Sequence, residues 1–347
     1  MSKHPSLGKL DHEGLGARGI AAASTTDCQR SQTFAAAGVS AVQVAEKVFG
    51  RVVPNRESPF AMATGMNFEH GITKHEAAKL VLLYQGSGRF ATKVKVLDLT
   101  NDTKDHDLQL QLAAEAEAII LDRMYHGGGP DVIIQFPIVM RPNQALLRPD
   151  FLVAVGERGW RVGEVKSYLD RDGLTDGYKV GSAVRQAAAG IVALLFLVRE
   201  HQLPEDLVDT KADLVLLRHG QEGASLRTLG AEAEILSIQE TLERSAELLS
   251  EASALAGGAS LDSEEAVQAI PHAYGPGCHG TCAMAEVCRG EAMANGQLLF
   301  DGAGVAALGL AGISGARAAA LAAGAKAENA QEEHMAKHMR RGWAASK

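Results

Sequence analysis

Two short segments combine carboxylates with a lysine at a spacing that could bind a divalent metal ion. One is R-P-D, ending at Asp150 and followed by an apolar run, and the other is E-V-K, from Glu164 to Lys166. Alternate side chains of a β-strand share a face, so Glu164 and Lys166 are expected to point the same way while Val165 points away. A tight hairpin over residues 156–159 brings Asp150 alongside them.

This combination of side chains suits metal-assisted hydrolysis of a phosphodiester. Two neighbouring carboxylates repel each other unless a cation lies between them, and Mg²⁺ and Mn²⁺ prefer such oxygen ligands. A metal ion held by Asp150 and Glu164 polarises a phosphoryl oxygen and lowers the pKa of a bound water, while Lys166 can orient that water. A Glu-x-Lys pair alone is typical of an exposed sheet surface, so the prediction depends on its combination with Asp150.

The four cysteines form a second set with metal-ligand spacing. They are Cys28, Cys278, Cys282 and Cys288. Three of them fall within eleven residues, which in a cytoplasmic protein favours metal or redox chemistry over disulfides. Four thiolates suit a [4Fe-4S] cluster or tetrahedral zinc equally well. His272 and His279 leave open a zinc site with one imidazole, and the further alternative is free thiols packed as small apolar groups.

Hydrophobic periodicity and turn residues predict the elements that position these groups. Helices are expected to begin near residues 24–31 and to cover 42–49, 60–84 with an interruption near Gly71, 108–125, 179–200 and 235–256. Strands are expected over 92–99, 132–140, 145–155, 159–167 and 214–217, the last entering a hairpin. This order predicts an α/β domain with a mixed central sheet flanked by helices.

The same pattern divides the chain into four parts. We expect a flexible lead over residues 1–23, a core over 24–256, a cysteine region over 257–300 and an Ala/Gly-rich helical tail over 301–347. The tail has many small residues, which disfavours a large core face.

Composition and charge narrow the class of protein. With 347 residues, 46% hydrophobic and 22% charged, the chain is typical of a globular protein. The net charge of -8 argues against a protein that coats nucleic acid, so such contact must come from local basic surface. Candidates are Lys93, Lys95, Arg141, Arg148, Arg158, Arg161, Lys337, Arg340 and Arg341. No apolar run of bilayer length and no secretory signal are apparent, which predicts a cytoplasmic protein with no membrane partner.

The carboxylate and lysine motifs resemble those of the PD-(D/E)XK nucleases. Pro149-Asp150 and Glu164-Val165-Lys166 match the family's two defining segments. Gln186 resembles the glutamine that opens a helix after the lysine strand in the RecB-like branch, although the usual tyrosine four residues on is Gly190 here. The segment from Gly65 to His70 is similar to that branch's helical motif, in which an acidic residue or a histidine completes the metal site. Glu69 fits the glycine spacing better, with His70 as the alternative.

The cysteine arrangement resembles that of iron-sulfur RecB-like nucleases, including CRISPR-associated exonucleases and the AddB nuclease domain. In these proteins one cysteine precedes the nuclease core and three follow it. Here the N-terminal Cys-Pro-Arg of the family is Cys28-Gln29-Arg30, and the C-terminal spacing, C-x3-C-x5-C, is one residue longer in its first gap. The resemblance implies a [4Fe-4S] cluster that joins both ends of a restriction-endonuclease-like core.

The resemblance also implies an activity and roles for the site residues. It implies a DNA nuclease, acting as an exonuclease on single-stranded ends, in DNA repair or antiviral defence. Asp150, Glu164, Glu69 and the Val165 carbonyl would hold Mg²⁺ or Mn²⁺, and Lys166 would position the attacking water. Gln186 would orient Lys166 or the DNA backbone.

A non-catalytic alternative is a nucleic-acid-binding or assembly subunit of a defence or repair complex, stapled by an iron-sulfur or zinc site. The missing tyrosine at Gly190 and the acidic balance favour this alternative. The sequence contains no helicase P-loop motif, so unwinding requires a partner protein.

Overall fold

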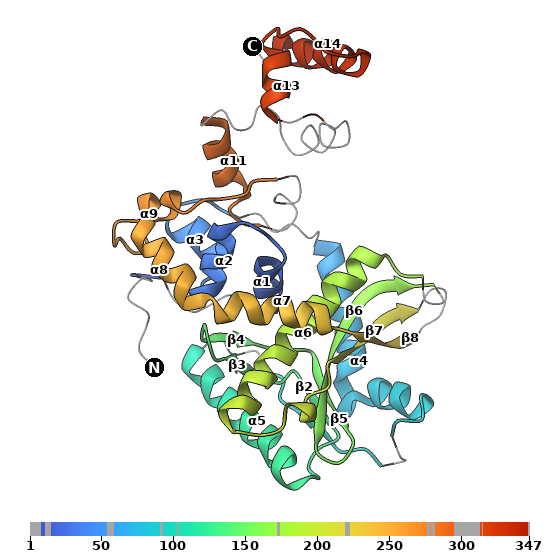
Figure 1. Cartoon of the computed structure of the whole chain (residues 1–347). Coiled ribbons are helices and arrows are strands. Elements are labelled where there is room, and N and C mark those ends of the chain that lie inside the picture. Colours follow the sequence, from blue (N-terminus) through green and yellow to red (C-terminus); the bar gives the residue numbers. More distant parts are fainter. Residues whose placement is uncertain are drawn as a thin grey trace.

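The protein folds around a mixed β-sheet with helices on both faces (Figure 1). The computed structural model describes residues 8–10, 15–53, 59–90, 93–101, 103, 105–171, 174–218, 223–275, 278, 282–294, 313 and 315–345. Six strands form the sheet in the order β1-β2-β5-β6-β7-β8. The predicted α/β class with a mixed central sheet is therefore confirmed.

The sheet combines parallel and antiparallel neighbours. Its strands are β1 (Val96–Asp98), β2 (Val132–Ile134), β5 (Phe151–Val155), β6 (Gly159–Asp170), β7 (Lys211–Arg218) and β8 (Ala224–Gly230). The pairs β1–β2 and β6–β7 are parallel, and the other neighbours are antiparallel. A separate hairpin contains β3 (Ile138–Met140) and β4 (Ala145–Leu147). Each of the predicted strands 132–140 and 145–155 is therefore two strands in the structure. The first of them, β2, is followed by Gln135, whose backbone has a positive φ of 48°.

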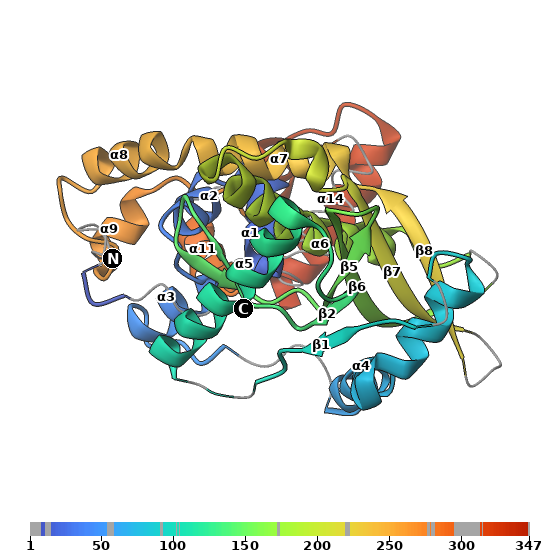
Figure 2. The ribbon, with the colours of Figure 1, turned by 90° about the horizontal axis from the view of Figure 1, so that it is seen from below.

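Different helices cover the two faces of the sheet (Figures 1 and 2). Helix α4 (Pro59–Gly86) packs on one face, where the core includes Leu80, Phe151 and Val165. Helices α5 (His106–His126) and α6 (Gly177–Glu200) lie on the other, beside Leu152 and Val162. The expected interruption of α4 near Gly71 is absent; the irregularity falls at Ala77, whose φ is 50°.

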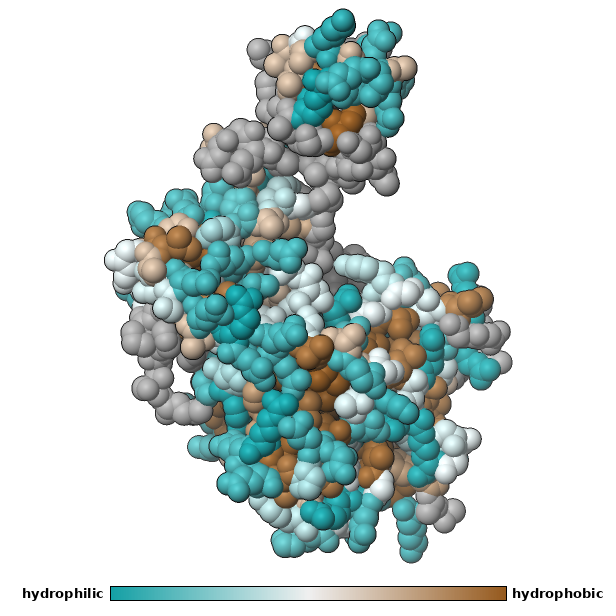
Figure 3. Space-filling model, in the orientation of Figure 1, coloured by the Kyte–Doolittle hydropathy of each residue, from teal (hydrophilic) through white to brown (hydrophobic). Residues whose placement is uncertain are grey.

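Helix α6 is the central helix of the larger core. Asp176 caps its first turn by accepting hydrogen bonds from the backbone N–H groups of Tyr178 and Lys179. Contrary to the expectation from the sequence, α6 is long and apolar enough to cross a membrane, but most of it is buried inside the fold. On the face in Figure 3, hydrophobic residues gather near the position of α6 in Figure 1, within a largely hydrophilic surface.

The N-terminal helices pack with the helices that follow the sheet. These elements are α1 (Ala17–Ser24), α2 (Gln29–Ala36), α3 (Ala41–Lys47), α7 (Glu232–Glu243), α8 (Ser245–Leu255), α9 (Glu264–Ala269) and α11 (Ala285–Ala294), with a short 3-10 turn η2 (Glu205–Leu207) before β7. Phe34, Val44, Leu248 and Val287 share a second core. Helix α1 buries Ile20 and therefore differs from the flexible lead expected over residues 1–23.

Two other predicted helices also differ from the structure. The helix predicted over residues 235–256 is two helices, α7 and α8, which meet at Arg244. In the tail, α13 (Gly315–Ala322) and α14 (Ala330–Ala345) pack on each other and lie away from the sheet in Figure 1. In the helical tail predicted over residues 301–347, residues 301–312, 314 and 346–347 lie outside the described residues.

Gly190 permits the close approach of α6 to the sheet. A Cβ atom at this position would lie 2.8 Å from Pro149 Cγ and 3.2 Å from Val162 Cγ1. A larger side chain here must displace a rigid proline ring next to Asp150. The tyrosine expected from the family resemblance therefore has no space at this position.

We expect Gly190→Ala to be less stable than the matched variant Gly181→Ala in the same helix. Both variants gain helix propensity, but only Gly190→Ala overpacks the helix–sheet contact, at a cost of about 1–3 kcal/mol. At Gly181 the nearest atom to a new Cβ is the end of the flexible Arg185 side chain, at 3.6 Å. Urea unfolding measures the difference, and equal free energies of unfolding would contradict this account of the packing.

Candidate active site

The candidate site lies where β6 continues beyond the first residue of β5. The two strands are in register from Val155 opposite Gly159 to Phe151 opposite Gly163. Beyond that point β6 keeps β7 on one side but no longer has β5 on the other. Glu164 and Lys166 therefore lie beside a notch in the sheet, and Asp150 lies at the start of β5.

The structure brings the three predicted groups together. The Lys166 ammonium lies 2.6 Å from Glu164 Oε2 and 3.9 Å from Asp150 Oδ2. The backbone N–H of Val165 donates to Asp150 Oδ2 over 2.7 Å. The N–H and C=O of one strand residue point to the same edge, so the Val165 carbonyl also points into the notch.

Glycine at position 163 allows the two strands to meet this closely. The Phe151 ring lies across the position that a Cβ of Gly163 would occupy, so no larger residue fits there without moving the ring. Phe151 is fully buried in the core beneath α4. The contact between Phe151 and Gly163 thus fixes the strand register that aligns Asp150 with Glu164, because each of these residues is next to one of the carboxylates.

Burial makes the carboxylates electrostatically unfavourable neighbours. Glu164 is only 4% exposed, and burial followed by the adjacent Asp150 carboxylate raises its pKa well above the ordinary value of 4.5. Lys166 opposes this rise but does not cancel it. Burial lowers the pKa of Lys166 itself, but the charges of Glu164 and Asp150 raise it by more, so Lys166 stays an ammonium. One ammonium does not fully compensate the two acids.

Glu69 joins the group from α4. Burial and the charge of Asp150 raise the pKa of Glu69, while Lys166 lowers it. The amide of Gln135 donates to Glu69 Oε1 over 2.8 Å, and the Gln135 N–H donates to the Asp150 carbonyl over 2.8 Å. Of the two alternatives in this helix, these contacts favour Glu69 over His70.

Gln135, which links Glu69 to Asp150, is not among the site residues predicted from the sequence. The sequence feature that could have indicated this residue is its position as a polar residue directly after the apolar strand β2, from Val132 to Ile134. Its left-handed backbone is uncommon for a residue other than glycine and occurs here beside the carboxylates. Gln186 is buried on α6 at 7% exposure, on the helix that carries Gly190 one turn later.

The donor set fits a hard divalent cation by its chemistry. Glu69, Asp150, Glu164 and the Val165 carbonyl offer only oxygen atoms, as Mg²⁺ and Mn²⁺ prefer. Within the described part of the chain, however, no three or more His, Cys, Asp or Glu side chains are arranged to hold an ion. Lys166 contacts Glu164, and one oxygen of Asp150 accepts from Val165, so these side chains must rearrange to bind a metal.

Arg30 connects the N-terminal helices to the segment that carries three cysteines. Its guanidinium is 1% exposed, donates to both carboxylate oxygens of Glu291 at 2.8 and 3.1 Å, and donates to the Ile270 carbonyl at 2.9 Å. It also donates to Cys288 Sγ over 3.3 Å. His272 lies 3.3 Å from Glu291. This buried arginine joins regions that are far apart in sequence.

Cys28 and Cys282 lie close enough to Cys288 to affect its pKa, but the four cysteines form no metal-binding group among the described residues. Burial raises the pKa of Cys288 to about 12; Arg30 opposes the rise, and nearby Cys282 and Cys28 add to it. The Cys282 N–H donates to the Cys278 carbonyl over 2.8 Å. Within the described ranges no three of these thiols lie together in a way that could hold an ion, and His279 lies outside those ranges. Thiolates are suitable ligands for an iron-sulfur cluster or zinc.

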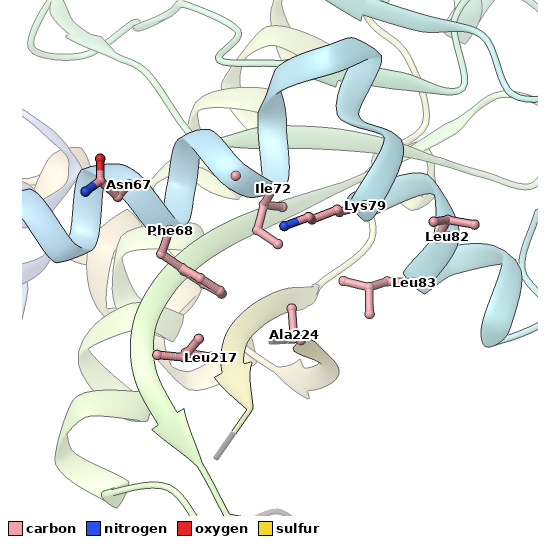
Figure 4. A pocket seen from close by; sticks show the side chains of 10 residues that line it. Asn67, Phe68, Ile72, Lys79, Leu82, Leu83, Leu217 and Ala224 are labelled. Atoms are coloured by element: carbon pink, nitrogen blue, oxygen red, sulfur yellow. The ribbon is translucent and has the colours of Figure 1, made fainter. Parts of the chain in front are cut away.

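A separate pocket of about 530 Å³ lies between α4 and the strands β7 and β8 (Figure 4). Phe68, Ile72 and Leu83 line it from the helix, Leu217 lines it from β7, and Lys79 extends into it. None of Asp150, Glu164 and Lys166 lines this pocket. It is therefore distinct from the carboxylate site, although Phe68 is adjacent to Glu69 in sequence.

Several of the basic side chains predicted to contact nucleic acid instead pair with other groups of the protein. Arg141 pairs with Glu117 and Glu200, and Arg161 pairs with Asp209 and Asp213. Arg148 and Arg158 donate to backbone carbonyls. Lys93, Lys95 and Lys337 are exposed, and nothing is described of the side chains of Arg340 and Arg341. The arginines near the sheet thus have structural partners.

Comparison with known proteins adds no family assignment. No protein-family model matches the chain, and no curated protein is significantly similar to it in sequence.

The raised pKa of Glu164 predicts how stability depends on pH in the metal-free protein. The folded state keeps a proton that the unfolded state releases near pH 4.5, so the free energy of unfolding should fall as pH rises from there towards the raised pKa. The slope should be up to about 1.4 kcal/mol per pH unit. Urea unfolding with a chelator, from pH 5 upwards, measures it.

Glu164→Gln should remove this part of the slope, whereas Glu205→Gln, at an exposed ion pair with Arg199, should leave it in place. An unchanged slope in Glu164→Gln would show that other groups cause the pH dependence.

Proposed function

We propose that this protein is a Mg²⁺- or Mn²⁺-dependent DNA nuclease with a restriction-endonuclease-like core, acting on single-stranded ends in repair or antiviral defence. The observation that carries the proposal is the convergence of Asp150, Glu164 and Lys166, with Glu69, at the notch in the sheet. A buried pair of carboxylates that one ammonium does not compensate destabilises the folded protein, and such groups are often found at functional sites.

The proposed mechanism assigns each group a separate role. Asp150, Glu164, Glu69 and the Val165 carbonyl would hold the metal ion, which when bound supplies Lewis-acid polarisation of the phosphate and a more acidic water. Lys166, kept charged by its two acidic neighbours, donates hydrogen bonds that orient the attacking water and stabilise the negative charge of the transition state. Gln135 positions Glu69 and the start of β5.

We expect the full-length protein with Mn²⁺ to shorten an end-labelled single-stranded oligodeoxynucleotide. Asp150→Ala and Lys166→Ala should each lower the rate by about 100-fold or more, because each removes a group that acts on the transition state. Lys211→Ala, an exposed lysine at the first residue of β7, should retain the full rate.

A circular single strand should resist digestion if the protein requires ends. Equal digestion by all these proteins would indicate a contaminating nuclease and contradict the proposal. Binding of the oligonucleotide without any cleavage would favour the non-catalytic subunit instead.

We further propose that Cys28, Cys278, Cys282 and Cys288 bind a [4Fe-4S] cluster. Two observations support this proposal. Cys28 and Cys282 are close enough to Cys288 to raise its pKa, and the Arg30 guanidinium donates a hydrogen bond to the Cys288 sulfur. Hydrogen bonds to sulfur ligands are among the groups that tune such clusters. The cluster would have a structural role next to the Arg30–Glu291 pair.

Protein purified without oxygen should therefore be brown, with visible absorbance and iron bound. Cys288→Ser should lose both the colour and the iron and should unfold at a lower temperature, because metal binding contributes directly to folding stability. A colourless preparation that contains zinc would contradict the cluster and show a zinc site instead. A colourless preparation without metal would show that the cysteines are packed as free thiols.

A further inference from the structure

The strand that carries the candidate site is irregular directly after Lys166. Lys166 is opposite Leu216 of β7, but the next paired residue of β6 is Leu169, opposite Leu217. Ser167 and Tyr168 are therefore extra residues that bulge out of the ladder between β6 and β7. Bulges redirect side chains and occur often beside active sites.

The bulge directs its two side chains to different surroundings. The hydroxyl of Ser167 lies 3.7 Å from the Cβ position of Gly65, on the α4 side. Tyr168 instead packs at the margin of the core beneath α6, the core that also contains Val162 two residues before Glu164. Its ring remains partly exposed, and it follows Lys166 by two residues on the same strand. Tyr168 is thus next to the candidate site on the α6 side.

Helix α6 places a cation over this ring. The Lys179 ammonium lies 5.5 Å from the centre of the Tyr168 ring, and the lysine is exposed. Lys179 is seven residues before Gln186, so both lie on one side of α6. An aromatic ring and a lysine ammonium therefore lie together, with the ring two residues after Lys166 on β6.

This pair has the chemistry of a single-strand binding subsite. Proteins that bind single strands stack bases on aromatic rings and contact the phosphates with basic side chains. Arg148 and Arg161, which precede Asp150 and Glu164 by two and three residues, already have partners within the protein. The exposed Lys179 is therefore better placed to meet a phosphate. The overall charge of -8 makes such a local cation more important for binding a polyanion.

We infer that Tyr168 and Lys179 form a nucleotide subsite beside the scissile phosphate, in which a base of a single strand stacks on the Tyr168 ring and Lys179 binds an adjacent phosphate. This inference rests on the proposed nuclease function and adds the residues that select a flexible single strand. Bases paired within a duplex cannot lie flat on the ring without being unstacked.

Binding can be tested separately from cleavage. The probe is a fluorescein-labelled oligothymidylate, and its anisotropy is measured with full-length protein carrying Asp150→Asn to prevent hydrolysis. In this background Tyr168→Ala should weaken binding about 5- to 150-fold, the range for loss of one stacked base. Tyr168→Phe and Tyr168→Trp keep the aromatic face and should bind within about twofold of the parent.

The salt dependence tests Lys179 independently. Losing one phosphate contact to a single strand should reduce the slope of log affinity against log salt concentration by about 0.7. Lys179→Gln should show this reduction, and the matched control Lys211→Gln, at the exposed start of β7, should not. Tyr178→Ala, at a tyrosine that is 70% exposed one residue before Lys179, controls for loss of any nearby aromatic ring.

The outcomes distinguish this inference from the proposed function. Cleavage that depends on Asp150, together with unchanged affinity in Tyr168→Ala and an unchanged salt slope in Lys179→Gln, would overturn the subsite alone. Absence of cleavage by the wild type, with both binding effects present, would refute the hydrolysis and retain the subsite. Weakened binding in Tyr168→Ala that Tyr168→Phe shares would also overturn it, because the ring face would then not be the contact.

Discussion

The candidate site depends on one electrostatic constraint: a single buried ammonium faces two neighbouring carboxylates. Lys166 remains charged because Glu164 and Asp150 surround it, yet Glu164 still holds its proton more tightly than an exposed glutamate. Such an arrangement survives only if the backbone fixes it, since the side chains themselves gain by moving apart. The β5–β6 register and the Val165 N–H provide that fixation.

Close packing on both sides of the sheet maintains this register. Phe151 can lie across β6 because residue 163 is glycine, and α6 can approach Pro149 because residue 190 is glycine. The two glycines act on opposite faces of the sheet: Gly163 lies beneath α4, and Gly190 lies on α6, where that helix packs on the sheet. The absence of side chains at these positions therefore contributes as much to the site as the charged residues do.

Much of the fold and the centre of the site could be predicted from sequence. The alternation of Glu164, Val165 and Lys166, and the long apolar pattern of α6, are local signals that tertiary structure did not override. The left-handed backbone of Gln135, the bulge at Tyr168 and the shift of the α4 irregularity to Ala77 could not be predicted. Each arises from contacts between segments that are distant in sequence, and such contacts leave no periodic pattern in the local sequence. The partners of Arg30 were missed for the same reason.

The buried pair of Arg30 and Glu291 also constrains the order in which the chain can fold during synthesis. The two residues are 261 positions apart, so the arginine emerges from the ribosome long before its carboxylate partner. At about 5–20 residues per second, the interval is about 13–50 s. The sheet, which ends at Gly230, can form within that time. Helix α1 can already pack on α6 at that stage, but Arg30 lacks its carboxylate partner until the segment that contains Glu291 has been made.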